Sequence, residues 1–270
     1  MLRTRIITAL IVAPIALVGV FVLPPFEFSI FVGAIIVVAG WEWGNLAGLK
    51  SEWQIIYAAC MAFAIGLSNF LPSEYVITVG ILWWLVALIF VLRYPSLSDI
   101  WASQKIVLLV GFLALVPGWV ALKQLKLFAD SSYIICLLFF LIWGADIGAY
   151  FVGRAFGRRK LASKVSPGKT WEGFFGGLLF VLAIAISMTI WSGELDLYSA
   201  EGIVFLGVCL LVGMISVLGD LVVSMFKRRR SIKDSSNLLP GHGGFLDRID
   251  SLLSAAPVFT FYLLFANGLP

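Results

Sequence analysis

Long apolar stretches alternate with short polar segments along the whole 270-residue chain. Each stretch approaches the length of about 20 residues that a membrane-spanning helix requires. The pattern therefore predicts an all-α, polytopic membrane protein with about nine transmembrane helices. The predicted spans are Ile6–Leu23, Phe28–Leu46, Trp53–Leu71, Tyr75–Leu92, Ile106–Leu122, Tyr133–Val152, Phe174–Trp191, Gly202–Phe226 and Leu252–Asn267.

The composition supports this interpretation, because 61% of the residues are hydrophobic and only 13% are charged. A soluble domain of this size would carry about a quarter charged residues. Arg3 and Arg5 before the first span would also fit a cleaved signal peptide. However, the apolar run ends in Pro24-Pro25 without a small-residue cleavage site, which favours a retained span.

The basic residues predict the orientation of the spans. If the spans alternate, one side of the membrane receives 17 of the 19 Lys and Arg residues, and the other side receives only Lys123 and Lys126. Cytoplasmic loops carry the basic excess, so the N-terminus is expected on the cytoplasmic side. We expect the protein in the cell inner membrane. The same charge favours contact with anionic membrane lipids.

No internal repeat or low-complexity linker divides the chain. We therefore expect a single membrane domain, 1–270, with N-terminal spans in 1–131 and the catalytic spans and cytoplasmic loops in 132–270. Cys60, Cys136 and Cys209 lie inside apolar spans without metal-type spacing, and are interpreted as packing residues.

Three acidic residues, Glu42, Asp146 and Asp220, fall inside predicted spans, where an ionisable group is a functional candidate. For Glu42, near a span end, the favoured interpretation is a structural hydrogen bond to a neighbouring helix. Asp146 and Asp220 lie at similar depth below the predicted cytoplasmic boundary. Two such carboxylates suit a shared cation-binding cavity, and their hard oxygen ligands favour magnesium.

Asp220 shares a helical face with Ser216, Ser224 and Lys227. The lipid hydrocarbon would not accommodate such a polar seam, so the seam is expected to face protein or a water-filled cavity. Tyr150 continues the face of Asp146 toward the following loop in the same way.

The first basic loop, Gly153–Gly173, contains the triplet Gly168-Lys169-Thr170. This triplet suggests a phosphate-binding P-loop, but that motif needs glycine at position 163, which is Ser163, and no strand is expected before it. We therefore reject a P-loop and predict a basic loop leading into a helix whose N-terminal amides can hold an anion.

The second basic loop, Lys227–Ser251, has three glycines around the only histidine, His242. Glycines allow backbone amides to approach phosphate closely. Asp247 and Asp250 follow, and they share one face if a helix begins there. The structural alternative for Asp247 is a helix cap.

These residues resemble the phosphatidate cytidylyltransferases, also called CDP-diacylglycerol synthases. The matching signature extends from Ser224 to Asp250 and includes Lys227-Arg228, Lys233-Asp234 and Leu239-Pro-Gly-His-Gly-Gly-Phe245. The segments Asp146–Arg154 and Ser166–Gly173 are similar to that family too. The motifs cover the C-terminal half of the chain, and the N-terminal spans carry no signature.

The resemblance implies that CTP and phosphatidate react to give CDP-diacylglycerol and pyrophosphate, with a divalent metal held by Asp220 and Asp247. We expect Mg²⁺, leave a second cation open, and expect a homodimer and no nucleic-acid partner. The expected catalytic residues are Asp220, Asp247, Lys227, Asp250 and Asp146. The expected substrate-binding residues are Ser224, Arg228, Lys233, His242, Gly243, Gly244, Arg248, Lys169 and Ser166.

Two other functions compete with this one. A transporter would explain the intramembrane carboxylates, but not a basic, glycine-rich loop followed by paired aspartates. A related CTP-dependent lipid enzyme, such as a polyprenol kinase or an archaeal-lipid cytidylyltransferase, differs in its lipid. Nothing in the sequence selects acyl chains over other tails or identifies the residues that contact cytosine.

Overall fold

The computed structural model describes residues 2–193 and 196–266, and most of these residues are helical. The long helices are α1 Leu2–Phe21, α2 Pro25–Leu46, α3 Ser51–Ser68, α4 Ser73–Leu92, α6 Gln104–Leu125, α7 Ser131–Phe156, α8 Trp171–Ser192, α9 Ala200–Arg229 and α10 Leu246–Ala266. The shorter elements are α5 Ser98–Trp101, β1 Lys160–Ala162 and β2 Ser166–Thr170.

Each predicted span corresponds to one of the long helices, which confirms an all-α, polytopic membrane protein. In the described ranges, seven helices are long and apolar enough to cross a membrane by length and composition. The other two long helices are α1 and α3. The largest boundary error is in α10, which begins at Leu246 rather than Leu252, while the predicted end at Asn267 lies outside the described residues.

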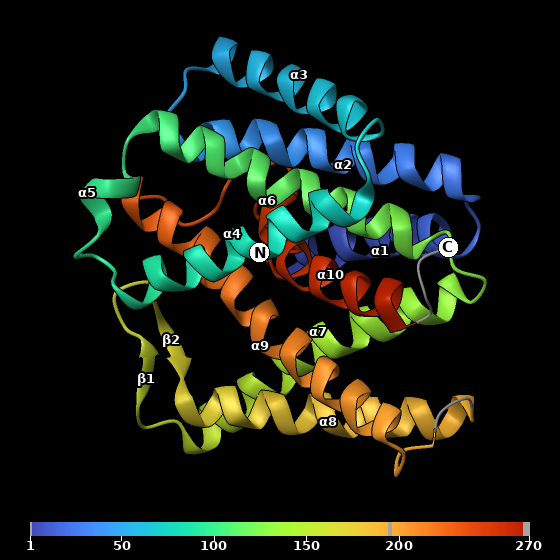
Figure 1. The fold of residues 1–270 in the computed structure, drawn as a ribbon. Coiled ribbons are helices and arrows are strands. Elements are labelled where there is room, and N and C mark those ends of the chain that lie inside the picture. The colour runs from blue at the N-terminus through green and yellow to red at the C-terminus, as the bar shows by residue number, and fades with distance from the viewer. Residues whose placement is uncertain (1, 194–195, 267–270) are drawn as a thin grey trace.

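Consecutive long helices run in opposite directions, as Figure 1 shows. The connections α2–α3, α4–α6, α7–α8 and α9–α10 consequently gather at one end of the molecule, where the β1–β2 hairpin also lies. The start of α1 belongs to the same end, because Thr8 Oγ1 donates a hydrogen bond to Pro240 O at 2.8 Å. The basic loops therefore occupy one end, as alternating spans require.

The β1–β2 hairpin corrects the expectation that no strand precedes Gly168-Lys169-Thr170. The two strands are antiparallel, with Lys160 opposite Thr170 and Ala162 opposite Ser166. Strands of three and five residues leave little alternation to detect in the sequence. The hairpin is still not a P-loop, because Thr170 caps α8 by accepting a hydrogen bond from Gly173 N at 3.1 Å.

Helices α9 and α10 approach each other closely at small residues. A side chain at Gly219 would overlap Asp250 O and Ser254 Oγ, and Ser254 Oγ donates to Ile215 O at 2.8 Å. Close contact of this kind is typical of membrane helices that pack through Gly and Ser. It brings the middle of α9 and the first turns of α10 together, and both carry the candidate carboxylates.

Candidate active site

Asp220 lies on α9 and faces the hairpin. Its Oδ2 accepts a hydrogen bond from Lys169 Nζ at 2.7 Å, and Ser224 Oγ donates to Oδ1 at 3.2 Å. The Lys169 and Asp220 side chains remain 24% and 31% exposed. Lys169 comes from β2, so this ion pair joins the hairpin to α9 and leaves both charged groups accessible.

Asp247, in the first turn of α10, has more partners. Lys227 Nζ donates to its Oδ1 at 2.7 Å, while Ser235 N and Gly244 N donate to its Oδ2 at 2.8 and 3.0 Å. Ser235 Oγ lies 3.0 Å from the same Oδ2. The Lys227 and Asp247 side chains are only 10% and 5% exposed. Asp247 is therefore held in one orientation from several directions.

The predicted polar seam of Ser216, Ser224 and Lys227 faces protein as expected, because all three residues are buried. Lys227 extends from this seam toward α10. Its ammonium group pairs with Asp247 on the facing helix. Ser216, from the same expected seam, donates instead to Gly213 O at 2.8 Å within its own helix. Only Ser224 contacts Asp220 as a shared helical face predicts.

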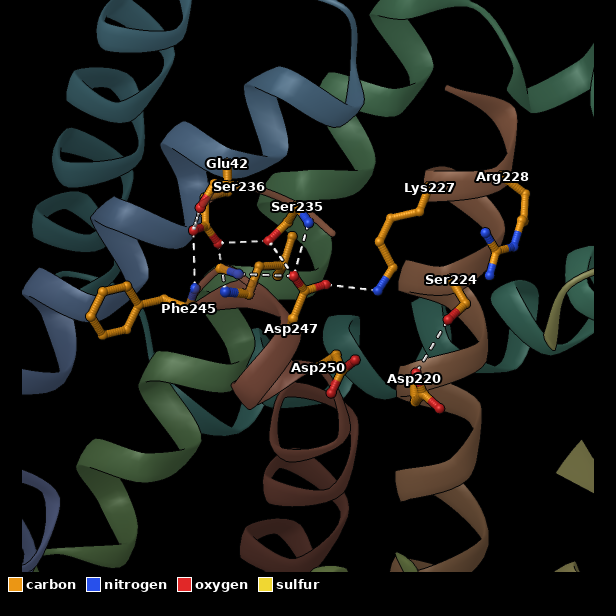
Figure 2. Close-up of polar contacts among 12 residues, drawn as sticks. Glu42, Asp220, Ser224, Lys227, Arg228, Ser235, Ser236, Phe245, Asp247 and Asp250 are labelled. Carbon is orange, nitrogen blue, oxygen red and sulfur yellow. Dashed lines mark hydrogen bonds and ion pairs between the residues drawn. The ribbon is translucent and has the colours of Figure 1, made fainter. Parts of the chain in front are cut away.

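Asp250 is buried between the two ion pairs. Its Oδ1 accepts a hydrogen bond from Ser251 N at 2.8 Å, and the charges of Asp220, Lys227 and Lys169 all act on it. Figure 2 shows Asp220, Asp247 and Asp250 on the facing sides of α9 and α10. The oxygens of these carboxyl groups are hard donors of the kind that bind a further cation such as magnesium.

Asp146 lies on α7 at the edge of a pocket of about 500 Å³. Lys169 lines the same pocket, which therefore continues to the Asp220 ion pair. Tyr150 and Arg154 also line it, and Arg154 donates to the Tyr150 hydroxyl at 2.9 Å. A separate cavity of about 600 Å³ between α2, α3 and α6 is lined by no acidic residue, so the carboxylate chemistry belongs to the smaller pocket.

Two glycines allow the loop before α10 to approach Asp247. Gly243 adopts φ +81°, a left-handed conformation that residues with side chains rarely adopt. At Gly244, a Cβ would overlap both Ser235 Oγ and Glu42 Oε1. A larger residue at either position would disturb the hydrogen bonds around Asp247.

The other predicted substrate-binding residues surround this centre less tightly. Arg228 Nε donates to Val165 O at 3.1 Å and so ties the end of α9 to the hairpin. Lys233 and Arg248 are exposed, and the charge of Arg248 acts on Asp146. Ser166 pairs with Ala162 in the hairpin. These residues are available to a polyanionic substrate that approaches from the loop end.

No described hydrogen bond joins His242 to the carboxylates. Its backbone N donates to Leu239 O at 2.8 Å, while its Nδ1 is buried without a hydrogen-bond partner. The backbone contact belongs to the turn that leads into Gly243 and Gly244.

Magnesium fits these residues in donor chemistry. In the described part of the chain, no three His, Cys, Asp or Glu side chains gather as a complete metal site. Mg²⁺ needs no such cage, because it usually takes one or two carboxylates and completes its coordination with water and substrate phosphates. Asp220 and Asp247 supply oxygens of that type on neighbouring helices.

Glu42 is the residue whose importance the sequence analysis underestimated. Its side chain, on α2, is fully buried and accepts hydrogen bonds from the loop before α10 and from the first residue of that helix. The structural interpretation is confirmed. The sequence did contain a signal of this importance, because Glu42 is the only acidic residue inside the predicted second span.

Comparison with known proteins gives a consistent result. The model of the cytidylyltransferase family matches residues 3–266. A phosphatidate cytidylyltransferase of Pseudomonas aeruginosa is 46% identical over 99% of this chain and 98% of its own length. The Haemophilus influenzae protein of the same name is 37% identical over 98% of this chain and 99% of its own, and that of Brucella suis 34% identical over 98% and 95%.

Proposed function

The chain belongs to the cytidylyltransferase family, and we propose that it transfers CMP from CTP to phosphatidate at the pocket lined by α7, α8 and the hairpin, next to the carboxylates of α9 and α10. The products are CDP-diacylglycerol and pyrophosphate. The observation that carries this assignment is the convergence of two Asp–Lys ion pairs beside a pocket at the basic end of the molecule. Both substrates are polyanions, and a site that mixes carboxylates with ammonium groups suits a metal–phosphate complex.

In the reaction, a phosphate oxygen of phosphatidate forms a bond to the α-phosphorus of CTP. The bond from that phosphorus to the bridging oxygen of the β-phosphate breaks, and pyrophosphate leaves with the electron pair. No general base is needed, because a phosphomonoester loses its second proton near pH 6. The obstacle that the protein must overcome is the repulsion between the two phosphates.

Lys169 and Lys227 are suited to reduce this repulsion. Lys169 is partly exposed on the pocket wall, so its ammonium can turn from Asp220 to an arriving phosphate. Lys227 is nearly buried and keeps a fixed positive charge beside Asp247. Arg228, Lys233 and Arg248 are exposed and add positive charge at the loop end of the molecule, and Ser224 offers a hydroxyl to a phosphate oxygen.

Asp220 and Asp247 would hold Mg²⁺, and Asp146 and Asp250 would orient its water ligands. When bound, the metal would neutralise the phosphate charge that develops as pyrophosphate leaves. The two carboxylates contribute fixed oxygen donors on helices that are packed tightly at Gly219. Rigid helices hold such donors more accurately than a mobile loop.

The site belongs on the cytoplasmic side of the inner membrane under this proposal. The basic loops gather at the end of the molecule where the pocket lies, and cytoplasmic loops carry the basic excess. CTP would enter from the cytosol. Phe151 and Phe175 are 61% and 58% exposed on α7 and α8 beside the pocket, so membrane lipid can approach it from the side.

An assay with labelled CTP tests the reaction. Purified protein in detergent receives phosphatidate, Mg²⁺ and CTP labelled at the α-phosphate, and a parallel sample receives an added polyprenol and CTP labelled at the γ-phosphate. We expect the α-label in a lipid and no γ-label in the polyprenol. The reverse result would assign the chain to the CTP-dependent lipid kinases.

We propose a homodimer on the basis of the family resemblance alone. Light scattering of the purified protein, corrected for bound detergent, should give twice the 29.6 kDa mass of the chain. A mass of one chain, with full transfer activity, would remove the dimer from the account.

A further inference from the structure

Glu42 is a buried carboxylate whose hydrogen bonds come from the segment between α9 and α10 and from the first residue of α10. Its Oε1 accepts from Ser236 Oγ at 2.5 Å and from Phe245 N at 3.0 Å. Its Oε2 accepts from Leu246 N at 2.6 Å, and Ser235 Oγ lies 3.1 Å away. The side chain is completely shielded from solvent, so water cannot replace these donors.

Two of those donors are backbone amides at the start of α10, Phe245 N and Leu246 N. The first amides of a helix have no partner within the helix and usually receive one from a nearby Ser, Thr, Asp or Asn. Here the partner comes from α2, about two hundred residues earlier in the sequence. Glu42 therefore fixes where α10 begins, and Asp247 is the next residue of that helix.

Ser235 connects Glu42 to Asp247 directly. Its hydroxyl lies 3.1 Å from Glu42 Oε2 and 3.0 Å from Asp247 Oδ2, so it stands between the two carboxylates and can donate its single proton to either of them. Its backbone N also donates to Asp247 Oδ2 at 2.8 Å. On the other side, Asn45 of α2 donates to Ser235 O at 2.9 Å. Figure 2 shows the continuous chain from Glu42 through Ser235 to Asp247 and Lys227.

We propose that Glu42 is a positioning residue for the transfer reaction. Its carboxylate holds the segment Ser235–Leu246 so that Asp247 keeps one oxygen toward Lys227 and the cation site. This inference rests on the proposed role of Asp247. It gives the N-terminal spans, which carry no family signature, a defined part in the site.

Replacement of Glu42 by glutamine should expose this role. A glutamine has nearly the same volume, but its NH₂ group donates, so it repels one set of the donors that the carboxylate accepts. The segment would then lose hydrogen bonds at Phe245 or Leu246 without losing any apolar packing. Glu42→Asp keeps the charge but is shorter, and should restore part of the function.

The experiment compares wild type with Glu42→Gln, Glu42→Asp and Ser235→Ala, with Glu27→Gln as the matched control. Glu27 is the other acidic residue of α2 and is exposed. We would measure hydrogen–deuterium exchange of peptides covering Ser235–Leu246, and KM for CTP, half-saturating Mg²⁺ and kcat. Glu42→Gln loses hydrogen bonds to a charged group, so exchange in this segment should become faster. The KM for CTP and the Mg²⁺ concentration at half-saturation should each rise about tenfold.

In the expected result for Glu42→Gln, the fall in kcat is smaller than the rise in KM for CTP and in half-saturating Mg²⁺. Ser235→Ala changes the same quantities in the same direction by less, and Glu27→Gln matches wild type. Unchanged exchange in Glu42→Gln, or a fall in kcat alone, would overturn the proposal. If Glu42→Gln does not fold, Ser235→Ala decides, and wild-type exchange and KM in that variant would overturn it. Exchange is measured without substrate, so it still tests positioning if the labelled assay rejects the reaction.

Discussion

The two Asp–Lys ion pairs of the site have the same 2.7 Å separation but opposite environments. Lys169 and Asp220 are 24% and 31% exposed, whereas Lys227 and Asp247 are 10% and 5% exposed. Among the described residues, Asp220 has Ser224 alone as a further hydrogen-bond donor, while Asp247 is held by two backbone amides and the Ser235 hydroxyl. The first pair can open, and the second is fixed.

The two ion pairs are chemically identical, but their different exposure suits them to different roles. An exposed pair contributes little stability, because solvent already screens its charges. A buried pair is different, since removal of one partner leaves an unpaired charge in a low-dielectric environment. The Lys169–Asp220 pair is thus suited to exchange partners with a substrate, and the Lys227–Asp247 pair is suited to hold the site in shape.

The strongest test of this contrast replaces each lysine by methionine. Lys227→Met should abolish transfer and also lower the melting temperature, since a broken buried pair costs about 3–5 kcal/mol. Lys169→Met should reduce transfer by a factor on the order of 100 with little change in melting temperature, because its charge acts mainly on the substrate.

Thermal unfolding in detergent and label transfer are measured on the same preparations, with Lys164→Met as the control. Lys164 is exposed in the turn of the same hairpin. An equal loss of stability in Lys169→Met and Lys227→Met would remove the distinction between an open and a fixed pair.

A second test addresses the packing around the fixed pair. Gly244→Ala should lower transfer more than tenfold and reduce the melting temperature, because its Cβ overlaps Ser235 Oγ and Glu42 Oε1. Gly66→Ala in α3 is the matched control, since a Cβ there meets no atom within 4 Å. If both alanine variants behave alike, the close packing around Asp247 does not contribute to transfer.

The smallest effect is expected at His242. His242→Gln should lower activity about fivefold, on the scale of one lost hydrogen bond, without removing the acidic limb of the pH–rate profile. The limb instead reports the second ionisation of phosphatidate, near pH 6. A profile that becomes flat below neutral pH in this variant would make His242 the essential base and contradict the mechanism.

The membrane architecture and the carboxylates could be predicted from the sequence because their signals are local. Long apolar runs predict the helices, and the basic loops predict which helix ends lie together. The start of α10 was placed too late because Asp247, Arg248 and Asp250 make its first turn polar, and polarity in an apolar chain resembles a loop.

The partners of the site residues could not be predicted, because they come from distant parts of the chain. Glu42 binds a segment about two hundred residues away, and Lys169 reaches Asp220 from a hairpin too short for its alternation to be detected. Helical spacing placed Lys227 on the face of Asp220, but it could not show that Lys227 pairs with Asp247 of the facing helix, which tight packing at Gly219 brings within reach. Such contacts depend on helix packing, which a single sequence does not contain.

The central claim is that transfer takes place at the pocket beside the carboxylates of α9 and α10, with Asp220 in the partly exposed ion pair and Asp247 in the buried one. The most direct measurement is the transfer of α-labelled phosphate from CTP to phosphatidate by wild type, Asp220→Asn and Asp247→Asn, with melting temperatures on the same samples. We predict that both variants lose transfer by about 100-fold or more, and that only Asp247→Asn is destabilised. Transfer at the wild-type rate in a folded Asp220→Asn protein would contradict the account.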